Sequence, residues 1–389
     1  MRKRLNSDNL SALVVGIGVV ALIIGFGVYF NSPQLNNSAF SQQKSFVPAT
    51  IVEDNGTITR VQIDKSQFKL APDLTNVKGY INSEPITLAD LKGKVVLVDF
   101  WTYSCINCIR TIPYLNAWYE KYADDGLVIV GVHTPEFEFE KDYNNVKTAV
   151  EKFGIKYPTV QDNENGTWEA YENRYWPRKY LIDNEGYIRY DHIGEGAYAE
   201  TEKVIQSLLT ERTEFTGANM TIEQSISNPE SPLTVNFDRI DTPELYFGYK
   251  YSRAPLGNSE GYKPDQVVKY IIPGEDGNTT IMPNRIYLDG EWKNNADHME
   301  LQSDVGRIVL SYSAKAVNIV AGGNGELHIL EDNSPLDNIS RGTDVSEDGI
   351  IKIDGQRLYN VVAHEDYGTH QITIEVAGRG FQIYTFTFG

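Results

Sequence analysis

The sequence has little cysteine: it holds only two, Cys105 and Cys108, separated by two residues. These two can bond only with each other or with another molecule. A zinc site would need two further ligands, and the H-x5-H pair His364 and His370 lies far away, in the other half of the chain. Attached c-type haem needs histidine directly after the second cysteine, where this chain has Ile109. We therefore predict no metal, and no cofactor other than a redox-active Cys105–Cys108 disulfide.

Positive charge is scarce as well. Thirty-five lysines and arginines face 53 aspartates and glutamates, so the net charge is −18. A surface with this excess of negative charge repels nucleic acid and disfavours an anionic membrane surface. We therefore predict no nucleic-acid partner.

Long apolar runs are limited to one, residues 10–30, which contain no charge. This run is long enough to cross a bilayer, and Arg2, Lys3 and Arg4 before it favour a cytoplasmic N-terminus. A cleaved signal peptide is the alternative, although no clear cleavage site follows. No cysteine follows the run closely, which excludes a lipoprotein anchor. We predict one N-terminal transmembrane helix in the cell membrane, with the remaining chain extracytoplasmic, where disulfides persist.

The two cysteines follow the apolar run Val95–Phe100 and precede a segment with helical periodicity. This places Cys105 at a helix N-terminus, where free N–H groups and the helix dipole favour a thiolate. Cys108 lies one turn further along, close enough to attack a mixed disulfide on Cys105. The alternative is a purely structural disulfide, but so short a ring removes little entropy from the unfolded chain. The pattern therefore indicates thiol–disulfide exchange.

Residues around the pair resemble the thioredoxin superfamily. Asp99 stands six residues before Cys105, where the superfamily has a buried carboxylate that assists deprotonation of the second cysteine. Pro113 matches a proline of the active-site helix, and Trp176-Pro177 matches a cis-proline that presents a backbone edge to the client chain. The resemblance thus implies Cys105, Cys108 and Asp99 as catalytic residues. It implies that Trp176, Pro177, Trp101 and Tyr103 bind the substrate.

Several short segments carry a closer resemblance: Phe100–Arg110, Gly131–Glu138, Arg174–Pro177, Gly194–Gly196, Thr242–Tyr249 and Tyr384–Gly389. They are similar to the DipZ-type redoxin family. The resemblance implies a TlpA-like thioredoxin domain followed by a C-terminal β-sandwich that resembles carbohydrate-binding modules. Typical members also carry an N-terminal multi-helix membrane domain that supplies electrons, which is not seen in this sequence. We therefore expect a separate membrane electron donor, protein thiol or disulfide clients, and carbohydrate as a further candidate ligand.

Periodicity divides the chain into four parts. Residues 1–30 form the cytoplasmic tip and anchor, 31–67 a linker and lead-in, 68–215 the thioredoxin domain, and 216–389 the sandwich. Strands alternate with helices in the thioredoxin part, which predicts an α/β sheet covered on both faces. The last part shows short apolar runs between turn pairs, which predicts an all-β, jelly-roll-like sandwich. Its predicted strands include Val267–Ile272, Arg307–Ser313, Ala316–Val320, Ile350–Ile353, Gln371–Val376 and Phe381–Phe388.

Three further residues could tune the thiols. Arg110 on the active-site helix either favours the thiolate or points to solvent. His133 and Glu136 follow a sheet strand at the edge where α/β sites gather. They either shift thiol pKa values or belong, with Glu138, to a solvated acidic loop with one structural histidine.

The function predicted from these parts is that of a thiol–disulfide oxidoreductase, with a reductase favoured by the TlpA-like resemblance. A disulfide oxidase or isomerase is an alternative. A thiol peroxidase is another, because Thr102-Tyr-Ser-Cys105 resembles a peroxidatic motif, although a second cysteine three residues along fits exchange better. A non-enzymatic surface protein would instead act through sandwich aromatics such as Trp292, Tyr246 and Tyr249, which could stack on sugars but in a sandwich are more often core.

Overall fold

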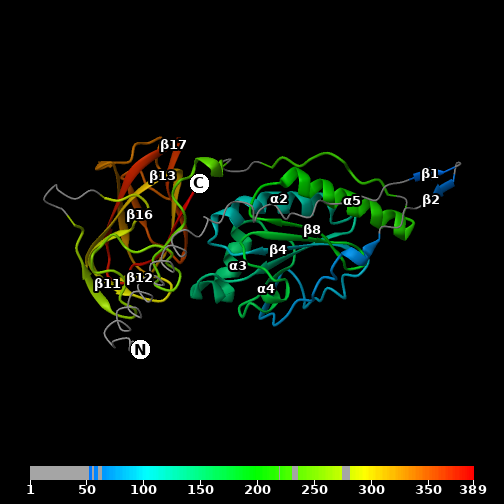
Figure 1. Ribbon diagram of the computed structural model, residues 1–389, viewed down its shortest axis with the longest axis horizontal. Coiled ribbons are helices and arrows are strands. Elements are labelled where there is room, and N and C mark those ends of the chain that lie inside the picture. The colour runs from blue at the N-terminus through cyan, green and yellow to red at the C-terminus, as the bar shows by residue number, and fades with distance from the viewer. Residues whose placement is uncertain (1–51, 55–56, 60–63, 219, 230–234, 274–280) are drawn as a thin grey trace, which may run out of the picture. The chain divides into compact units, whose positions relative to one another are not determined.

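The computed structural model describes residues 52–389, apart from residues 55–56, 60–63, 219, 230–234 and 274–280 (Figure 1). The predicted membrane helix and most of the predicted linker lie outside the described residues. Among the described residues, no helix has the length and apolar character needed to cross a membrane. The described residues belong to one compact unit. They begin with a short hairpin, β1 (Val52–Asp54) and β2 (Thr57–Thr59), and a 3-10 turn η2 (Lys65–Gln67).

The first large region is a six-stranded sheet with the strand order β3-β6-β5-β4-β7-β8. Strands β4, β5 and β6 run parallel, while β3, β7 and β8 pair antiparallel to their neighbours. The strands are β3 (Gly79–Ile81), β4 (Val95–Trp101), β5 (Leu127–His133), β6 (Thr159–Gln161), β7 (Arg178–Ile182) and β8 (Ile188–Ile193). The helical segments are α2 (Ile106–Tyr122), η3 (Glu138–Lys141), α3 (Tyr143–Lys152), α4 (Gly166–Ala170) and α5 (Tyr198–Thr216).

Side chains of β4 alternate between the two faces of this sheet, as successive residues of a strand do. Val95 and Leu97 pack with apolar residues of α2, α3 and α5, whereas Val96 and Val98 pack on the other face with Trp168 of α4 and the lead-in chain. The predicted thioredoxin-like α/β fold is confirmed. It places the odd-numbered residues of β4 beneath the active-site helix α2.

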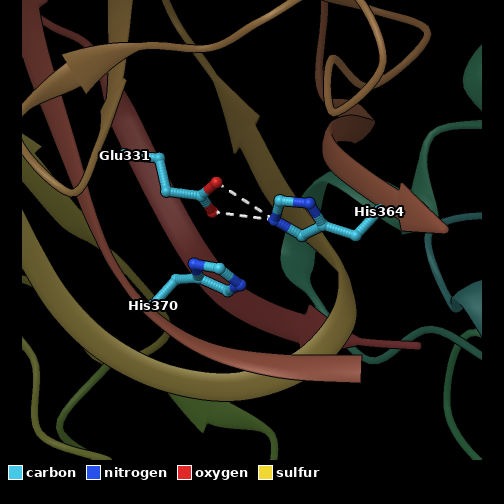
Figure 2. Close-up of side chains that lie close together, drawn as sticks. All are labelled: Glu331, His364 and His370. Atoms are coloured by element: carbon cyan, nitrogen blue, oxygen red, sulfur yellow. Dashed lines mark hydrogen bonds and ion pairs between the residues drawn. The ribbon is translucent and has the colours of Figure 1, made fainter. Parts of the chain in front are cut away.

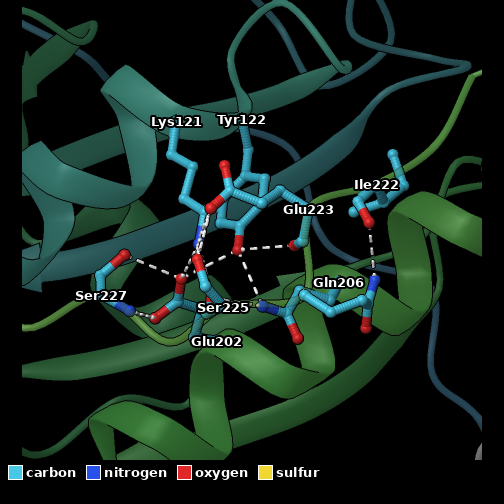
Figure 3. A network of polar contacts seen from close by, with 9 residues as sticks. Lys121, Tyr122, Glu202, Gln206, Ile222, Glu223, Ser225 and Ser227 are labelled. Atoms are coloured by element: carbon cyan, nitrogen blue, oxygen red, sulfur yellow. Dashed lines mark hydrogen bonds and ion pairs between the residues drawn. The ribbon is translucent and has the colours of Figure 1, made fainter.

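A polar network ties the chain that follows α5 to the thioredoxin-like region (Figure 3). The Glu202 carboxylate of α5 accepts hydrogen bonds from the Tyr122 hydroxyl at 2.8 Å and from the Ser227 N–H at 2.7 Å. Lys121 donates to Glu202 at 3.2 Å and to the Ser225 carbonyl. These contacts fix the exit from α5, and hence the start of the second region.

The C-terminal region is all-β, as predicted. After η4 (Phe237–Arg239), its described strands form one ten-stranded antiparallel sheet. They are β9 (Leu245–Tyr246), β10 (Val267–Tyr270), β11 (Tyr287–Asn294), β12 (Met299–Leu301), β13 (Val305–Gly322), β14 (Glu326–Glu331), β15 (Ser334–Pro335), β16 (Ile350–Lys352), β17 (Arg357–Ala377) and β18 (Gln382–Phe388).

Two strands, β13 and β17, are much longer than the sequence predicted. The runs Arg307–Ser313 and Ala316–Val320 are not separate strands but parts of β13, which continues through the irregularity between them. Both ends of β13 contribute to the same core, since Ile308 and Ile319 belong to one cluster, so the sheet curves around it. Trp292 is fully buried in that core and Tyr246 is buried as well, which agrees with a core role and removes both as exposed sugar platforms.

Candidate active site

The cysteine pair occupies the first turn of α2. Cys105 is the N-cap residue, with an extended backbone, and its Sγ accepts the Cys108 N–H at 3.4 Å. This contact, the free N–H groups of the first turn and the helix dipole all favour negative charge on the Cys105 sulfur. Cys105 is partly exposed, Cys108 is only 1% exposed, and neither forms a disulfide in the structure. The accessible sulfur is therefore Cys105, and Cys108 lies behind it.

Asp99 lies on the face of β4 that α2 covers, and it is buried. Burial raises its pKa to about 7, and the charge of Lys179 opposes part of this rise. Burial also raises the pKa of Cys108, with the nearby Cys105 sulfur and the Asp99 charge adding to the effect. One oxygen of Asp99 has no hydrogen-bond partner among the described residues. A buried carboxyl that changes charge near neutral pH is suited to accepting a proton from the second cysteine.

Lys179 is a charged residue at this site that sequence reasoning missed. It pairs directly with Asp99 across β4 and β7 and is 0% exposed. Its Nζ donates to the Gly194 carbonyl at 3.1 Å. Burial lowers its pKa, while Asp99 and Cys108 act in the opposite direction. The sequence did contain a signal for its burial. Side chains alternate between the two faces of a strand, so Lys179 lies on the same face of β7 as the buried Leu181.

The Trp176-Pro177 peptide bond is cis, as the family resemblance implied. The Trp176 indole N–H donates to the Thr134 carbonyl at 3.1 Å, and the ring packs against Trp168 with centroids 4.2 Å apart. Trp176 is partly exposed and lines the same cavity as Cys105. This arrangement brings the predicted client-binding residue Trp176 beside the reactive sulfur.

Two predictions need correction. Arg110 does not point to solvent: it is buried, and its Nε donates to Glu195 at 2.7 Å. A salt bridge of this kind offsets the positive charge that Arg110 could have offered to a thiolate. Trp101 is 1% exposed and meets His133 edge to face, so the prediction that it contacts a client is wrong. Tyr103 is also largely buried, and it lines a second cavity.

The loop after β5 is not the solvated acidic loop that was one alternative. Of its three glutamates, Glu136, Glu138 and Glu140, only Glu138 is exposed. Glu140, which sequence reasoning missed, is buried and accepts hydrogen bonds from the Ser104 hydroxyl at 2.6 Å and the Glu136 and Phe137 N–H groups at 2.6 and 2.9 Å. It therefore joins this loop to the residue before Cys105. The sequence did contain a signal for this burial. Phe137 and Phe139 alternate with the three glutamates, and two phenylalanines in so short a segment favour packing against the protein over a solvated loop.

His133 and Glu136 differ in what they offer. His133 is fully buried, and burial lowers its pKa to about 3, so it stays neutral at physiological pH. Its Nε2 lies 3.3 Å from the Thr102 hydroxyl and its ring stacks on Tyr103. Burial, with the charges of Glu244 and Glu140, raises the pKa of Glu136. Only Glu136 of the two lines a cavity with Cys105.

Residues of the C-terminal region complete the surroundings of Cys105. A cavity of about 470 Å³ contains Cys105, Glu136 and Trp176 on one side. The Tyr246 hydroxyl contacts Glu136 at 2.6 Å and Glu244 at 2.8 Å. The other side is formed by Phe237, Ile240, Thr242, Pro243, Glu244, Tyr246, Arg253, Thr387 and Phe388. A client disulfide approaching Cys105 through this cavity would therefore meet both regions of the chain.

Comparison with known proteins finds relatives for both regions of the chain. Residues 68–191 match the family described as "AhpC/TSA family", and residues 242–389 match "Thioredoxin like C-terminal domain". Protein DipZ of Mycobacterium bovis (strain ATCC BAA-935 / AF2122/97) is 35% identical over 323 residues, which are 82% of this chain and 43% of that protein. "Thiol-disulfide oxidoreductase YkuV" of Bacillus subtilis (strain 168) is 33% identical over 141 residues, covering 36% of this chain and 94% of that protein.

The chain belongs to the DipZ-type redoxin family. This redoxin spans less than half the length of the curated DipZ protein that it matches. Among solved structures, "Solution Structure of a Thioredoxin-like Protein in the Oxidized Form" is 31% identical to this redoxin, covers 38% of this chain and 98% of its own, and has a TM-score of 0.35.

Proposed function

We propose that this redoxin is a thiol–disulfide oxidoreductase that reduces disulfides of extracytoplasmic proteins. The observation that carries the proposal is the Cys105–Cys108 pair at the start of α2, above the buried Asp99 carboxyl. The relatives named as thiol-disulfide oxidoreductases support the same activity. The apolar run of residues 10–30 supports a membrane anchor that holds the catalytic region outside the cytoplasm.

The reaction begins at the exposed sulfur. The Cys105 thiolate attacks one sulfur of a client disulfide, forms a mixed disulfide, and releases the other client sulfur, which takes a proton from solvent. The Cys108 thiol then gives its proton to Asp99 and attacks the Cys105 sulfur. The second client thiolate leaves and is protonated. Two electrons have passed from the Cys105–Cys108 dithiol to the client, and a membrane electron donor must reduce the resulting disulfide.

The surroundings of Cys105 favour exchange over peroxide reduction. A peroxidatic cysteine needs a threonine or serine hydroxyl and an arginine beside its sulfur. Here the Thr102 hydroxyl lies 3.3 Å from His133 Nε2, and Arg110 forms a salt bridge with Glu195. Cys108 is one helical turn from Cys105, where it can resolve a mixed disulfide directly.

Trp176 and Glu136 support the proposal that the client lies in the cavity next to Cys105. We propose that Trp176 and the Pro177 backbone hold the client chain and that the C-terminal region limits which clients reach the sulfur. Carbohydrate binding by the C-terminal region has weaker support, because Trp292 and Tyr246 are buried.

The reduction potential of the Cys105–Cys108 couple tests the direction of electron flow. The full-length chain would be equilibrated with glutathione and dithiothreitol buffers, and its thiol state read by alkylation and mass spectrometry. A potential near or below about −250 mV is expected for a reductase, whereas one near about −120 mV would identify a disulfide donor and contradict the proposal. The Cys105→Ser/Cys108→Ser variant gives the alkylation baseline.

A further inference from the structure

Two histidines and a glutamate meet in the C-terminal region, away from the cysteines (Figure 2). His364 Nε2 lies 3.0 Å from one oxygen of Glu331 and 3.2 Å from the other. The imidazole of His370 stacks on that of His364, with centroids 4.6 Å apart and planes at 20°. One possible ligand atom from each of the three residues lies within 4.8 Å of the others.

A bulge in β17 brings the two histidines together. Ala314 of β13 pairs with Gly368, and Ala316 pairs with Ala363, so two steps along β13 correspond to five along β17. In a regular strand, residues six positions apart would be separated by about 20 Å, at about 3.3 Å per residue. The extra residues instead fold the chain so that His364 and His370 face each other. Bulges of this kind are common where a strand must re-aim side chains at a functional site.

The surroundings of His370 fit a ligand that is held in place. Its Nδ1 lies 2.9 Å from an Asp332 carboxylate oxygen, and the tautomer that donates Nδ1–H to this oxygen has its electron pair on Nε2. A Cβ at Gly368 would lie 2.5 Å from His370 Nε2, so a side chain at position 368 would force the imidazole to shift. On the other ligand, the Tyr312 hydroxyl donates to Glu331. A carboxylate behind a histidine and a donor behind a carboxylate are the usual supports of metal ligands.

We propose that Glu331, His364 and His370 bind a divalent transition-metal ion. Two imidazole nitrogens and one carboxylate suit Zn²⁺ and other divalent transition-metal ions, whereas Mg²⁺ and Ca²⁺ prefer oxygen ligands alone. With metal–ligand distances of about 2.0–2.2 Å, tetrahedral ligand atoms lie about 3.4 Å apart, so closing the present cluster needs movements of about 1 Å. The two stacked imidazoles must also rotate, because each histidine binds a metal through a lone pair in the plane of its ring. The ion takes the place of the proton between His364 and Glu331. Three protein ligands leave a fourth position open to water or another ligand.

The sequence did not predict this site, because the histidines were weighed only as partners of the distant cysteines. The proposal is independent of the redox function. It concerns residues that lie on β14 and β17, and none of the three lines the cavity of Cys105.

Zinc titration of the full-length chain tests the proposal. Cysteine thiolates also bind zinc, so both cysteines would first be replaced by serine in every protein used. Competition with a chromophoric chelator should then show one zinc ion per chain. His364→Ala and His370→Ala should each weaken binding by at least tenfold, and Asp332→Asn by about 10- to 100-fold. His328→Ala is the matched control, because His328 lies near Glu326 on the same sheet, outside the proposed ligand cluster.

Circular dichroism of each variant would establish that it is folded. If a histidine variant fails to fold, Asp332→Asn still tests the site, because the Asp332 side chain is largely exposed and its replacement should not disturb the core. Loss of binding in the His364, His370 and Asp332 variants with retention in His328→Ala supports the site. Absence of stoichiometric zinc binding, or binding that these variants leave unchanged, overturns it and leaves the cluster as two stacked imidazoles, each hydrogen-bonded to a carboxylate.

Discussion

Replacing Asp99 with asparagine should stabilise the protein, and the gain should depend on pH. The pKa of this carboxyl is raised from 3.8 to about 7 by burial. Between these two values the folded chain holds a proton that the unfolded chain has lost. Stability of the parent protein must therefore fall as pH rises from about 4 to about 7 and then level off. The two pKa values are about three pH units apart, which at 1.36 kcal/mol per unit amounts to about 4 kcal/mol.

Asparagine has nearly the same shape and does not ionise, so Asp99→Asn loses this pH dependence. Its free energy of unfolding relative to the parent should rise by about 4 kcal/mol between pH 4 and pH 8. At pH 4 Asp99 is neutral in the parent too, so any cost of leaving Lys179 without a charged partner is already present there. The difference between the two pH values therefore reports the ionisation of Asp99 together with its effect on the neighbouring Lys179.

Urea unfolding at several pH values, followed by circular dichroism, gives the measurement. Both proteins should be oxidised, so that neither thiol titrates. Asp124→Asn, at an exposed aspartate on the loop after α2, is the control and should show no comparable pH dependence. A stability difference between Asp99→Asn and the parent that is the same at pH 4 and pH 8 would refute the assignment of Asp99 as a carboxyl that titrates near neutral pH.

Three further changes test the site and the fold. Lys179→Gln removes the charge that lowers the pKa of Asp99. In rapid-quench assays, the pH midpoint for resolution of a Cys105 mixed disulfide should therefore move upward. An unchanged midpoint would show that Lys179 does not influence this step. Glu140→Ala leaves buried N–H groups without an acceptor and should cost about 3 kcal/mol in urea unfolding, whereas Glu138→Ala should stay within about 0.5 kcal/mol. Trp292→Ala empties a fully buried position and should cost about 3–5 kcal/mol; a cost below about 1 kcal/mol would contradict its place in the core.

Local patterns were enough to predict the thioredoxin-like region and the cysteine pair. The strand Val95–Trp101 is apolar and buried throughout, and Cys105 caps the helix that follows it. Both features depend on residues adjacent in sequence. The burial of Asp99 was predicted from the resemblance to thioredoxins, which have a buried carboxylate at this position, and the structure confirms it.

The parts that escaped prediction depend on contacts between distant segments. Lys179 looks like an ordinary surface lysine until β7 pairs with β4 and brings it to Asp99. Glu136 acquires its contact with Tyr246 only when the C-terminal region packs beside the active site. The bulge in β17 is specified by pairing with β13, so the meeting of His364 and His370 could not be derived from their spacing alone.

The central claim is that Cys105 attacks client disulfides and Cys108 resolves the product. Trapping tests it most directly: reduced full-length Cys108→Ser and Cys105→Ser variants would each be incubated with a disulfide-bonded client such as insulin and examined by intact mass spectrometry. The account predicts a stable adduct, one client chain joined through Cys105, for Cys108→Ser and almost none for Cys105→Ser, because Cys108 is buried. Equal trapping by both variants, or trapping by neither, would contradict it.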